Sequence, residues 1–336
     1  MPNDSSRRIT ICDRHFSLGG RPLWLNGVNT PWQHWNDFGG RFDPAFWDGH
    51  FSELRRIGVN ATRIWINCDG FVGIQLDADG AFLSVSDKHW QDLDTLFALA
   101  QKHGLYIMPT LLSFDHFKDV KGKHMPWRRL ISDPAKIRSF VDGYVIPFVQ
   151  RYGGCEQLFS IDLMNEPDWV VRNPECGQLP WENLSRLFAC CTAAIHQYSD
   201  ILVTVGMGMI LNNSDRFLGN QVSDERLAAL AGTDSAYLDF WSPHFYQWEA
   251  QFSPGPFGLT PEAFGLDGTR PAVIGECAAV DETGVPLADR YEAAWREGWD
   301  GVFAWTSNGV DKCGGFEDIK PAAERMLALD PERIKL

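Results

Sequence analysis

Signatures of several common functional classes are missing from this chain of 336 residues. Its eight cysteines form no CxxC pair and no metal-ligand spacing, so we expect free thiols rather than a zinc site or disulfides. Basic residues number 30 against 44 acidic ones, and the net charge of −14 disfavours a nucleic-acid or anionic-membrane partner. A neutral ligand such as a sugar suits this charge, and we expect no metal and no organic cofactor.

Long apolar runs are also missing. No run of about 18 apolar residues predicts a membrane span, and no apolar stretch follows the basic pair Arg7 and Arg8. We therefore expect a cytoplasmic location, or a secreted protein if a leader was removed. No composition break or low-complexity linker divides the chain, so one domain over residues 1–336 is expected. The oligomeric state stays open.

What the chain does contain is an alternation of short β-branched or apolar segments with longer helical patterns, repeated about eight times, as βα units require. Eight units predict an α/β fold of the closed (β/α)8 TIM-barrel type. The expected strands are 23–28, 61–66, 105–111, 158–164, 201–207, 239–245, 272–276 and 301–306. The expected helices include 44–57, 86–104, 181–198, 224–231, 288–298 and 318–329.

The segment from Ile9 to Leu18 is typical of a small N-terminal β-hairpin, which we expect to plug the barrel floor. A doubly wound open sheet is the alternative fold, because it too alternates strand and helix. That fold favours a glycine-rich phosphate loop after the first strand, whereas this chain continues there with Asn29-Thr-Pro-Trp-Gln-His-Trp.

Two glutamates stand where an apolar strand gives way to a polar loop: Glu166 within Asn165-Glu166-Pro167, and Glu276 within Ile274-Gly275-Glu276. Cleavage of a glycosidic bond with retention needs one carboxyl group to protonate the leaving oxygen and a second, ionised one to attack the sugar from the opposite face. The pair therefore predicts a retaining glycosidase, with Glu166 and Glu276 as its catalytic residues.

Side-chain alternation along the strands indicates which residues face the barrel interior. Asp162, Met164 and Glu166 share the inner face, and Pro167 is expected to keep Glu166 extended. Asn165 has the opposite parity, so it reaches the site only through a bulge. By the same alternation Glu276 shares its face with Ile274.

Electrostatics connects these positions. Arg63 points into the barrel from the second strand and needs an anionic partner, for which Glu276 is the natural candidate. Held by Arg63 and by the hydroxyl of Tyr246, Glu276 is expected to have a lowered pKa and to stay ionised. The nearby negative charge is expected to raise the pKa of Glu166 and keep it protonated. Arg63 could instead form a structural ion pair with Asp162.

Other candidates for substrate binding lie at the rim. His244 and Tyr246 end the sixth strand on one face, and His244 is a candidate for direct substrate contact. Trp305 ends the last strand and is expected to be a stacking platform. Trp32 and His116 follow the first and third strands and are candidates for outer subsites.

The combination of Asn165-Glu166-Pro167, His244-Phe-Tyr246, Ile274-Gly-Glu276 and Phe303-Ala-Trp305 resembles clan A glycoside hydrolases, most closely family 5. The resemblance implies that Glu166 is the acid/base and Glu276 the nucleophile. It implies that Asn165 donates to the sugar 2-hydroxyl and that Arg63 and Tyr246 support the nucleophile. It also implies that Trp305 forms the floor of the −1 subsite.

Residues 25–32 and 104–116 are similar to the β-mannanase branch of that family. Ser113-Phe-Asp-His116 departs from it, because those enzymes tend to carry an Asn-Asn-Trp-Asp-type stretch there. We therefore expect a β-glycoside substrate of manno or gluco configuration, with linkage and endo or exo action open.

Two alternatives use the same scaffold: a transglycosylase, and a carbohydrate-binding barrel without turnover. A metal-dependent barrel hydrolase is a less favoured alternative. Such an enzyme is expected to carry His-x-His after the first strand, where this chain has a lone His34.

Overall fold

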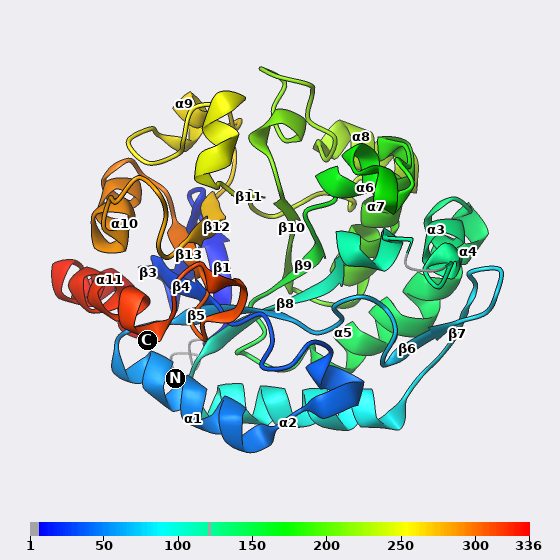
Figure 1. Ribbon diagram of the computed structural model, residues 1–336, viewed down its shortest axis with the longest axis horizontal. Helices are drawn as coiled ribbons and strands as arrows, with labels where there is room; N and C mark the ends of the chain where they lie inside the picture. The colour runs from blue at the N-terminus through cyan, green and yellow to red at the C-terminus, as the bar shows by residue number, and fades with distance from the viewer. Residues whose placement is uncertain (1–6, 120–121) are drawn as a thin grey trace, which may run out of the picture.

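The computed structural model describes residues 7–119 and 122–336, and its central feature is an eight-stranded parallel sheet. The sheet order is β11-β10-β9-β8-β5-β4-β13-β12. Single parallel bridges, Trp241 to Ala272 and His244 to Glu276, join the two outer strands and close the barrel (Figure 1). The strands are β4 (Leu25–Asn29), β5 (Ala61–Trp65), β8 (Tyr106–Ser113), β9 (Ser160–Asn165), β10 (Leu202–Met207), β11 (Ser242–Pro243), β12 (Val273–Ala278) and β13 (Gly301–Trp305). The predicted (β/α)8 barrel is confirmed.

Helices connect the strands and surround them as an outer ring (Figure 1). Their ends follow capping chemistry: the Ser86 side chain accepts from the amide of His89 at the start of α2, and Gly104 ends that helix in the left-handed conformation. The α-helices are α1 (Pro44–Arg56), α2 (Asp87–His103), α3 (Met125–Ile131), α4 (Pro134–Phe140), α5 (Ile146–Tyr152), α6 (Asp168–Arg172), α7 (Trp181–Tyr198), α8 (Asp224–Ala231), α9 (Pro261–Phe264), α10 (Leu287–Arg296), α11 (Phe316–Leu329) and α12 (Pro331–Ile334).

The N-terminal segment closes the bottom of the barrel as expected. Strands β1 (Ile9–Cys12), β2 (His15–Leu18) and β3 (Arg21–Pro22) form a small antiparallel sheet. Phe16 is fully buried in a cluster with residues of the barrel strands, and its ring lies 6.4 Å from that of Phe159 and 5.2 Å from that of Phe240. The lower half of the barrel is therefore a packed core, and the cavity that holds a site lies at the other end.

Two elements differ from the sequence-based expectation. The sixth strand was predicted over 239–245, but β11 contains only Ser242 and Pro243, and the pairing with β12 on either side is limited to single bridges at Trp241 and His244. Pro243, which has no amide hydrogen, interrupts the ladder between these two bridges. A hairpin of β6 (Ile74–Leu76) and β7 (Phe82–Val85) also stands between β5 and α2. In the described part of the chain, no helix combines the length and hydrophobicity that crossing a bilayer requires.

Candidate active site

A bulge near the end of β9 sets the position of Asn165 and Glu166. Thr204 of β10 pairs with Asp162, but the next pair joins Gly206 to Asn165, so β9 carries one extra residue. The Asp162 carboxylate fixes this irregularity by accepting from the amides of Met164 at 3.2 Å and Gly206 at 2.8 Å. The bulge turns Asn165 inward, as the sequence required, and turns Met164 into the outer core, against expectation.

The strand β12 contains a matching bulge before Glu276. Ile274 pairs with Val302 and Cys277 with Ala304, so β12 again has one residue more than its neighbour. Ile274 consequently packs in the outer core, and its predicted shared face with Glu276 is wrong. The Asn29 amide donates to the carbonyl of Gly275 at 3.1 Å and thereby holds the bulge. Both glutamates therefore follow a local break in strand alternation.

Arg63 lies at the centre of the polar network below the glutamates. Its guanidinium is fully buried and donates to carboxylates and to amide oxygens on neighbouring strands. The partners are Asp162 at 2.8 Å, Glu276 at 2.5 Å, Asn165 at 2.8 Å and Asn29 at 3.0 Å. The two pairings considered for Arg63, with Glu276 and with Asp162, thus both occur. Because the Asn165 oxygen accepts from Arg63, its amide nitrogen is left to face the cleft, which Asn165 lines.

Glu276 accepts hydrogen bonds that stabilise its charged form. In addition to Arg63, the Tyr246 hydroxyl donates to Glu276 Oε2 at 2.7 Å. Burial nevertheless raises the pKa of Glu276, against the opposing effects of His244, Arg63 and Tyr246, so the expected lowering is wrong in direction. Glu276 still has a guanidinium in direct contact, whereas no arginine or lysine in the described part of the chain forms an ion pair with Glu166. A proton shared by the two therefore lies on Glu166.

Glu166 occupies an unusual backbone conformation. Its φ of 46° lies in the left-handed region, so the strand ends at Asn165 and the predicted extension through Glu166 is wrong. The side chain accepts from Trp169 Nε1 at 2.8 Å. Burial raises the pKa of Glu166 to about 7 and is the principal cause, in place of the expected charge of Glu276. This value keeps Glu166 largely protonated below neutral pH.

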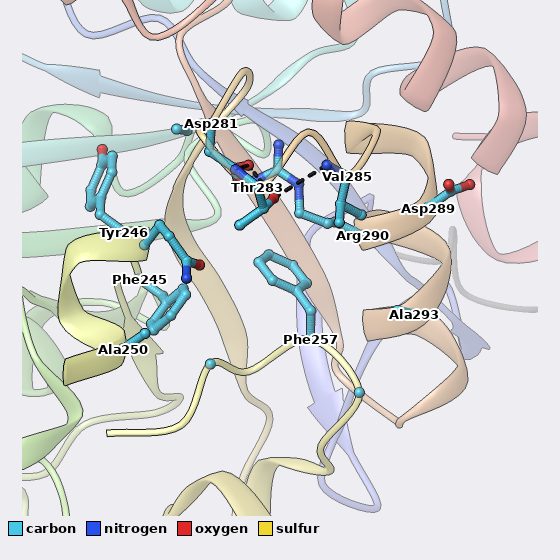
Figure 2. Close-up of a pocket in the computed structure, with 14 residues that line it drawn as sticks. Phe245, Tyr246, Ala250, Phe257, Asp281, Thr283, Val285, Asp289, Arg290 and Ala293 are labelled. Carbon is cyan, nitrogen blue, oxygen red and sulfur yellow. Dashed lines mark hydrogen bonds and ion pairs between the residues drawn. The ribbon is translucent and has the colours of Figure 1, made fainter. Parts of the chain in front are cut away.

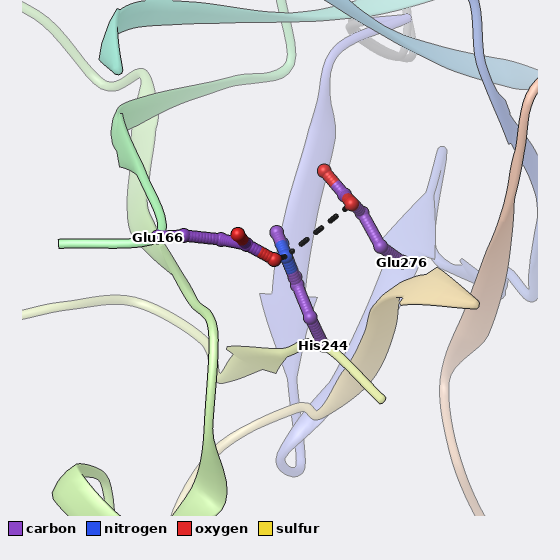
Figure 3. Close-up of side chains that lie close together, drawn as sticks. All are labelled: Glu166, His244 and Glu276. Atoms are coloured by element: carbon purple, nitrogen blue, oxygen red, sulfur yellow. Dashed lines mark hydrogen bonds and ion pairs between the residues drawn. The ribbon is translucent and has the colours of Figure 1, made fainter. Parts of the chain in front are cut away.

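The two glutamates converge with His244 in one place (Figure 3). One ligand atom from each of the three side chains lies within 4.8 Å of the other two. A carboxyl separation near 5 Å is typical of retaining glycosidases, whereas inverting ones leave roughly 6.5–9.5 Å for a water. His244 Nδ1 is 3.1 Å from Glu166 Oε1 and 3.5 Å from Glu276 Oε2. Because burial lowers the pKa of His244 to about 4, its ring is uncharged at neutral pH.

Among the residues that the structure describes, these three also form the group whose ligand atoms could hold a metal ion. Their ligand atoms already have partners, because Trp169 donates to Glu166 and Arg63 balances the charge of Glu276. The set is thus better suited to proton transfer and nucleophilic attack than to binding a cation.

Aromatic side chains form the walls of a cleft of about 400 Å³ above the glutamates. Trp305 and Trp32 line it together with Trp65, and the ring of Trp32 lies 5.8 Å from that of Trp305 and 5.0 Å from that of Trp65. On another side, Trp169 and Trp248 line the cleft with their ring centroids 5.8 Å apart. Flat apolar rings beside carboxylates suit a sugar, which has apolar C–H faces and polar edges.

Two predicted substrate contacts are not placed in the cleft. His116 is fully buried, its ring packs 4.7 Å from that of Trp127, and its Nδ1 contacts the carbonyl of Ser113. His244 is likewise fully buried beneath the two carboxyl groups. His116 is separated from the cleft because it folds back onto its own short 3-10 turn. Neither residue lines the cleft, and His244 contacts the two glutamates instead.

The sequence reasoning missed Trp169 and Glu249. Trp169 stands three residues after Glu166, one helical turn away, and this spacing is the signal that could have indicated it. Glu249 is buried and accepts from the amide of Tyr246 at 2.9 Å. Burial, reinforced by the neighbouring carboxyl groups of Glu166, Asp168 and Glu276, raises the pKa of Glu249 to about 9. It is therefore an uncharged carboxyl group at neutral pH.

The chain is similar to mannanases from several animals. It is 24% identical over 342 residues to a mannan endo-1,4-beta-mannosidase of Cryptopygus antarcticus, a match that covers 93% of this chain and 87% of that protein. It is 24% identical over 344 residues to the enzyme of the same name from Mytilus edulis, covering 93% and 92%. No family model matches the chain.

Solved structures agree with these relatives. The beta-1,4-mannanase from Aplysia kurodai superposes with a TM-score of 0.86 at 22% identity and covers 98% of this chain and 99% of that one. The endo-1,4-beta-mannanase from Eisenia fetida gives a TM-score of 0.85 at 23% identity, covering 95% of each chain. These structures confirm the barrel fold, and the similarity to mannan endo-1,4-beta-mannosidases agrees with the resemblance to clan A glycoside hydrolases that the motifs indicate.

Proposed function

We propose that this protein is a retaining β-glycoside hydrolase. It cleaves internal bonds of β-1,4-linked mannan through a covalent glycosyl-enzyme. The observation that carries the proposal is the convergence of Glu166 and Glu276, whose oxygens approach within 4.8 Å at the base of an aromatic cleft. Manno configuration and internal cleavage are supported by the names of the relatives, which are mannan endo-1,4-beta-mannosidases.

In the first step, Glu166 donates its proton to the leaving glycosidic oxygen while Glu276 attacks the anomeric carbon. The C–O bond to the leaving sugar breaks, and an ester bond to Glu276 forms. Esterification removes the negative charge of Glu276, which lowers the cost of ionising Glu166. Glu166 then takes a proton from water, whose oxygen attacks the same carbon and releases Glu276.

Neighbouring residues position these groups. Tyr246 and Arg63 hold the two oxygens of Glu276 and stabilise it as the leaving carboxylate in the second step. Asn165, whose oxygen is fixed by Arg63, offers its amide nitrogen to the sugar 2-hydroxyl. Trp305 supplies the floor of the −1 subsite, and Trp32 contributes to an outer subsite. The absence of a nucleic-acid partner and the cytoplasmic location stay predictions.

Azide rescue tests the two catalytic roles. Glu276→Ala and Glu166→Ala should each lower kcat/KM on a β-1,4-mannooligosaccharide by several orders of magnitude, on the order of 10³-fold or more. In Glu276→Ala, azide should attack the anomeric carbon of an activated aryl β-mannoside directly, displace the aryl group and give the α-mannosyl azide. In Glu166→Ala it should attack the glycosyl-enzyme and give the β-azide. The exposed Glu53→Ala serves as control and should keep full activity.

Full activity in either variant, or the same azide anomer from both, would exclude the assignment. Hydrolysis and transglycosylation use the same residues, so the ratio of transfer products to hydrolysis products at high acceptor concentration separates them. A binding protein without turnover would give no product under any of these conditions.

A further inference from the structure

Glu249 is a buried carboxyl group that takes no part in the proton and bond transfers of the proposed reaction. It lies in the 3-10 turn η6 (Gln247–Gln251), which follows β11, and it is only 2% exposed. Figure 2 shows Tyr246 at the start of this turn and Ala250 near its end. Because acidic side chains are rarely buried so completely, the contacts of Glu249 indicate what it does.

The Glu249 side chain supplies an acceptor that the backbone needs where it leaves the barrel. The amide of Phe245 still donates to the carbonyl of Glu276 at 3.0 Å, as in a parallel ladder. The amide of the next residue, Tyr246, donates instead to Glu249 Oε1 at 2.9 Å, and the amide of Glu249 donates in return to the carbonyl of Tyr246 at 2.8 Å. These two bonds fix the backbone of Tyr246, whose hydroxyl contacts Glu276 at 2.7 Å.

The same turn carries part of the cleft wall. Trp248 directly precedes Glu249, lines the cleft and is 42% exposed, and its ring lies 5.8 Å from that of Trp169. After Glu249, its carbonyl accepts from the amides of Phe252 at 2.8 Å and Ser253 at 3.1 Å, which closes the turn. The shape of the turn therefore decides where the Trp248 ring stands in the cleft.

The surroundings of Glu249 favour a neutral carboxyl group. Among residues 7–119 and 122–336, no lysine, arginine or histidine forms an ion pair with it. Burial raises its pKa most, and the carboxyl groups of Glu166, Asp168 and Glu276 add to this effect. A protonated carboxyl group has one acceptor oxygen and one O–H donor, so it can hold Tyr246 without adding negative charge beside the catalytic pair.

We propose that Glu249, as a neutral carboxyl group, is a positioning residue that fixes Tyr246 against Glu276 and Trp248 in the cleft wall. Glu249 does not line the cleft, so it acts through these two residues. Its effect on kcat passes through the Tyr246 hydroxyl, and its effect on KM passes through the Trp248 ring. The inference rests on the proposed function, because Tyr246 matters to the rate only if Glu276 is the nucleophile.

Two substitutions of similar size separate the acceptor from the volume of the side chain. Glu249→Met fills the space but cannot accept from Tyr246, whereas Glu249→Gln is neutral and keeps an acceptor oxygen. On a β-1,4-mannooligosaccharide, Glu249→Met should lower kcat by roughly ten-fold and raise KM. Glu249→Gln should keep both constants close to those of wild type. The exposed Glu262→Ala, in another short helix, is the control and should change neither.

A double substitution tests whether the effect on kcat passes through Tyr246. In the Tyr246→Phe background the hydroxyl that contacts Glu276 is already absent, so adding Glu249→Met should lower kcat by less than about two-fold. Losses that multiply in the double variant would overturn the proposal. A wild-type kcat in Glu249→Met, or equal losses in Glu249→Met and Glu249→Gln, would also overturn it.

Stability measurements test the neutral carboxyl group independently of activity and of whether Glu249→Met folds. The pKa of Glu249 is about 9 in the folded state and about 4.3 in an unfolded chain, so wild type loses stability as the pH rises between these values. Glutamine has no proton to lose, so the urea midpoint of Glu249→Gln should rise relative to wild type from about pH 5 to about pH 8. A difference that does not change with pH would overturn the proposal. Wild type without activity on mannan would instead contradict the proposed function.

Discussion

At the scale of single residues, the two glutamates differ because their neighbours differ. Glu276 is in contact with a guanidinium and a phenol, both of which favour the carboxylate. Glu166 is partly buried beside an uncharged imidazole and an indole, and this burial is the main cause that raises its pKa to about 7. The acid and the nucleophile are thus distinguished by hydrogen-bond partners rather than by residue type.

The hydrogen bond from Trp169 leads to a prediction for the pH profile. The protonated acid is lost as the pH rises through the pKa of Glu166, so kcat/KM should fall on the alkaline side near pH 7. The Trp169 indole donates to the carboxylate and therefore lowers this pKa. In Trp169→Phe the donor is lost, the protonated form is favoured, and the alkaline limb of kcat/KM should move to higher pH.

The control for this experiment is Trp248→Phe. It also removes an indole from the cleft wall, but Trp248 makes no hydrogen bond to Glu166 among the described contacts. Its KM can change, whereas its alkaline limb should stay in place. An alkaline limb that moves to lower pH in Trp169→Phe, or equally in both variants, would contradict the role given to the indole.

At the scale of elements, the sequence predicted most strands and helices closely. The helices expected at 181–198 and 224–231 begin and end as predicted, because apolar spacing and, for α8, the caps Ser223 and Gly232 are local signals. The pair of glutamates was also predictable, since each stands at a strand end. The two bulges were harder to place: that of β9 was only inferred for Asn165, and that of β12 was missed.

The bulges depend on contacts between distant parts of the chain. Side-chain alternation along the strands therefore did not predict which residues face inward near the site. The Asp162 carboxylate fixes the first by bonding the amide of Gly206, 44 residues away. The Asn29 amide fixes the second by bonding Gly275, 246 residues away. Likewise, nothing local to Ser113-Phe-Asp-His116 indicates that the imidazole of His116 turns into the core beside Trp127.

Strand β10 supports the network through a residue without a side chain. A Cβ at Gly206 would lie 2.8 Å from His244 Nε2 and 3.0 Å from both Arg63 Nη2 and Asp162 Oδ2. Gly206→Ala should therefore displace the groups that position both glutamates and lower kcat on the order of 10²-fold. The free energy of unfolding, measured in urea, should fall by about 1–3 kcal/mol.

Gly154→Ala is the matched control, because nothing lies within 4 Å of a Cβ at that exposed position. It should leave kcat unchanged. Wild-type kcat in Gly206→Ala would show that the network can shift without disturbing the glutamates, contrary to the role given to β10.

At the scale of the whole molecule, the two ends of the barrel have different roles. The N-terminal sheet closes the floor, where Phe16 packs against Phe159 and Phe240. The glutamates lie at the opposite end, where the strands finish and the loops begin. Stability and chemistry are thereby separated along the barrel axis, as is general for this fold.

This separation can be tested at Phe16. Phe16→Ala leaves a cavity in the floor cluster and should lower the free energy of unfolding by about 3–5 kcal/mol. The exposed Leu83→Ala should stay within about 0.5 kcal/mol of wild type.

At a temperature where both variants are folded, kcat of Phe16→Ala should equal that of wild type, because Phe159 and Phe240 precede Glu166 and His244 by at least four residues of fixed backbone. A fall in kcat without a fall in stability would mean that the floor positions the glutamates, and the two ends would then act as one unit.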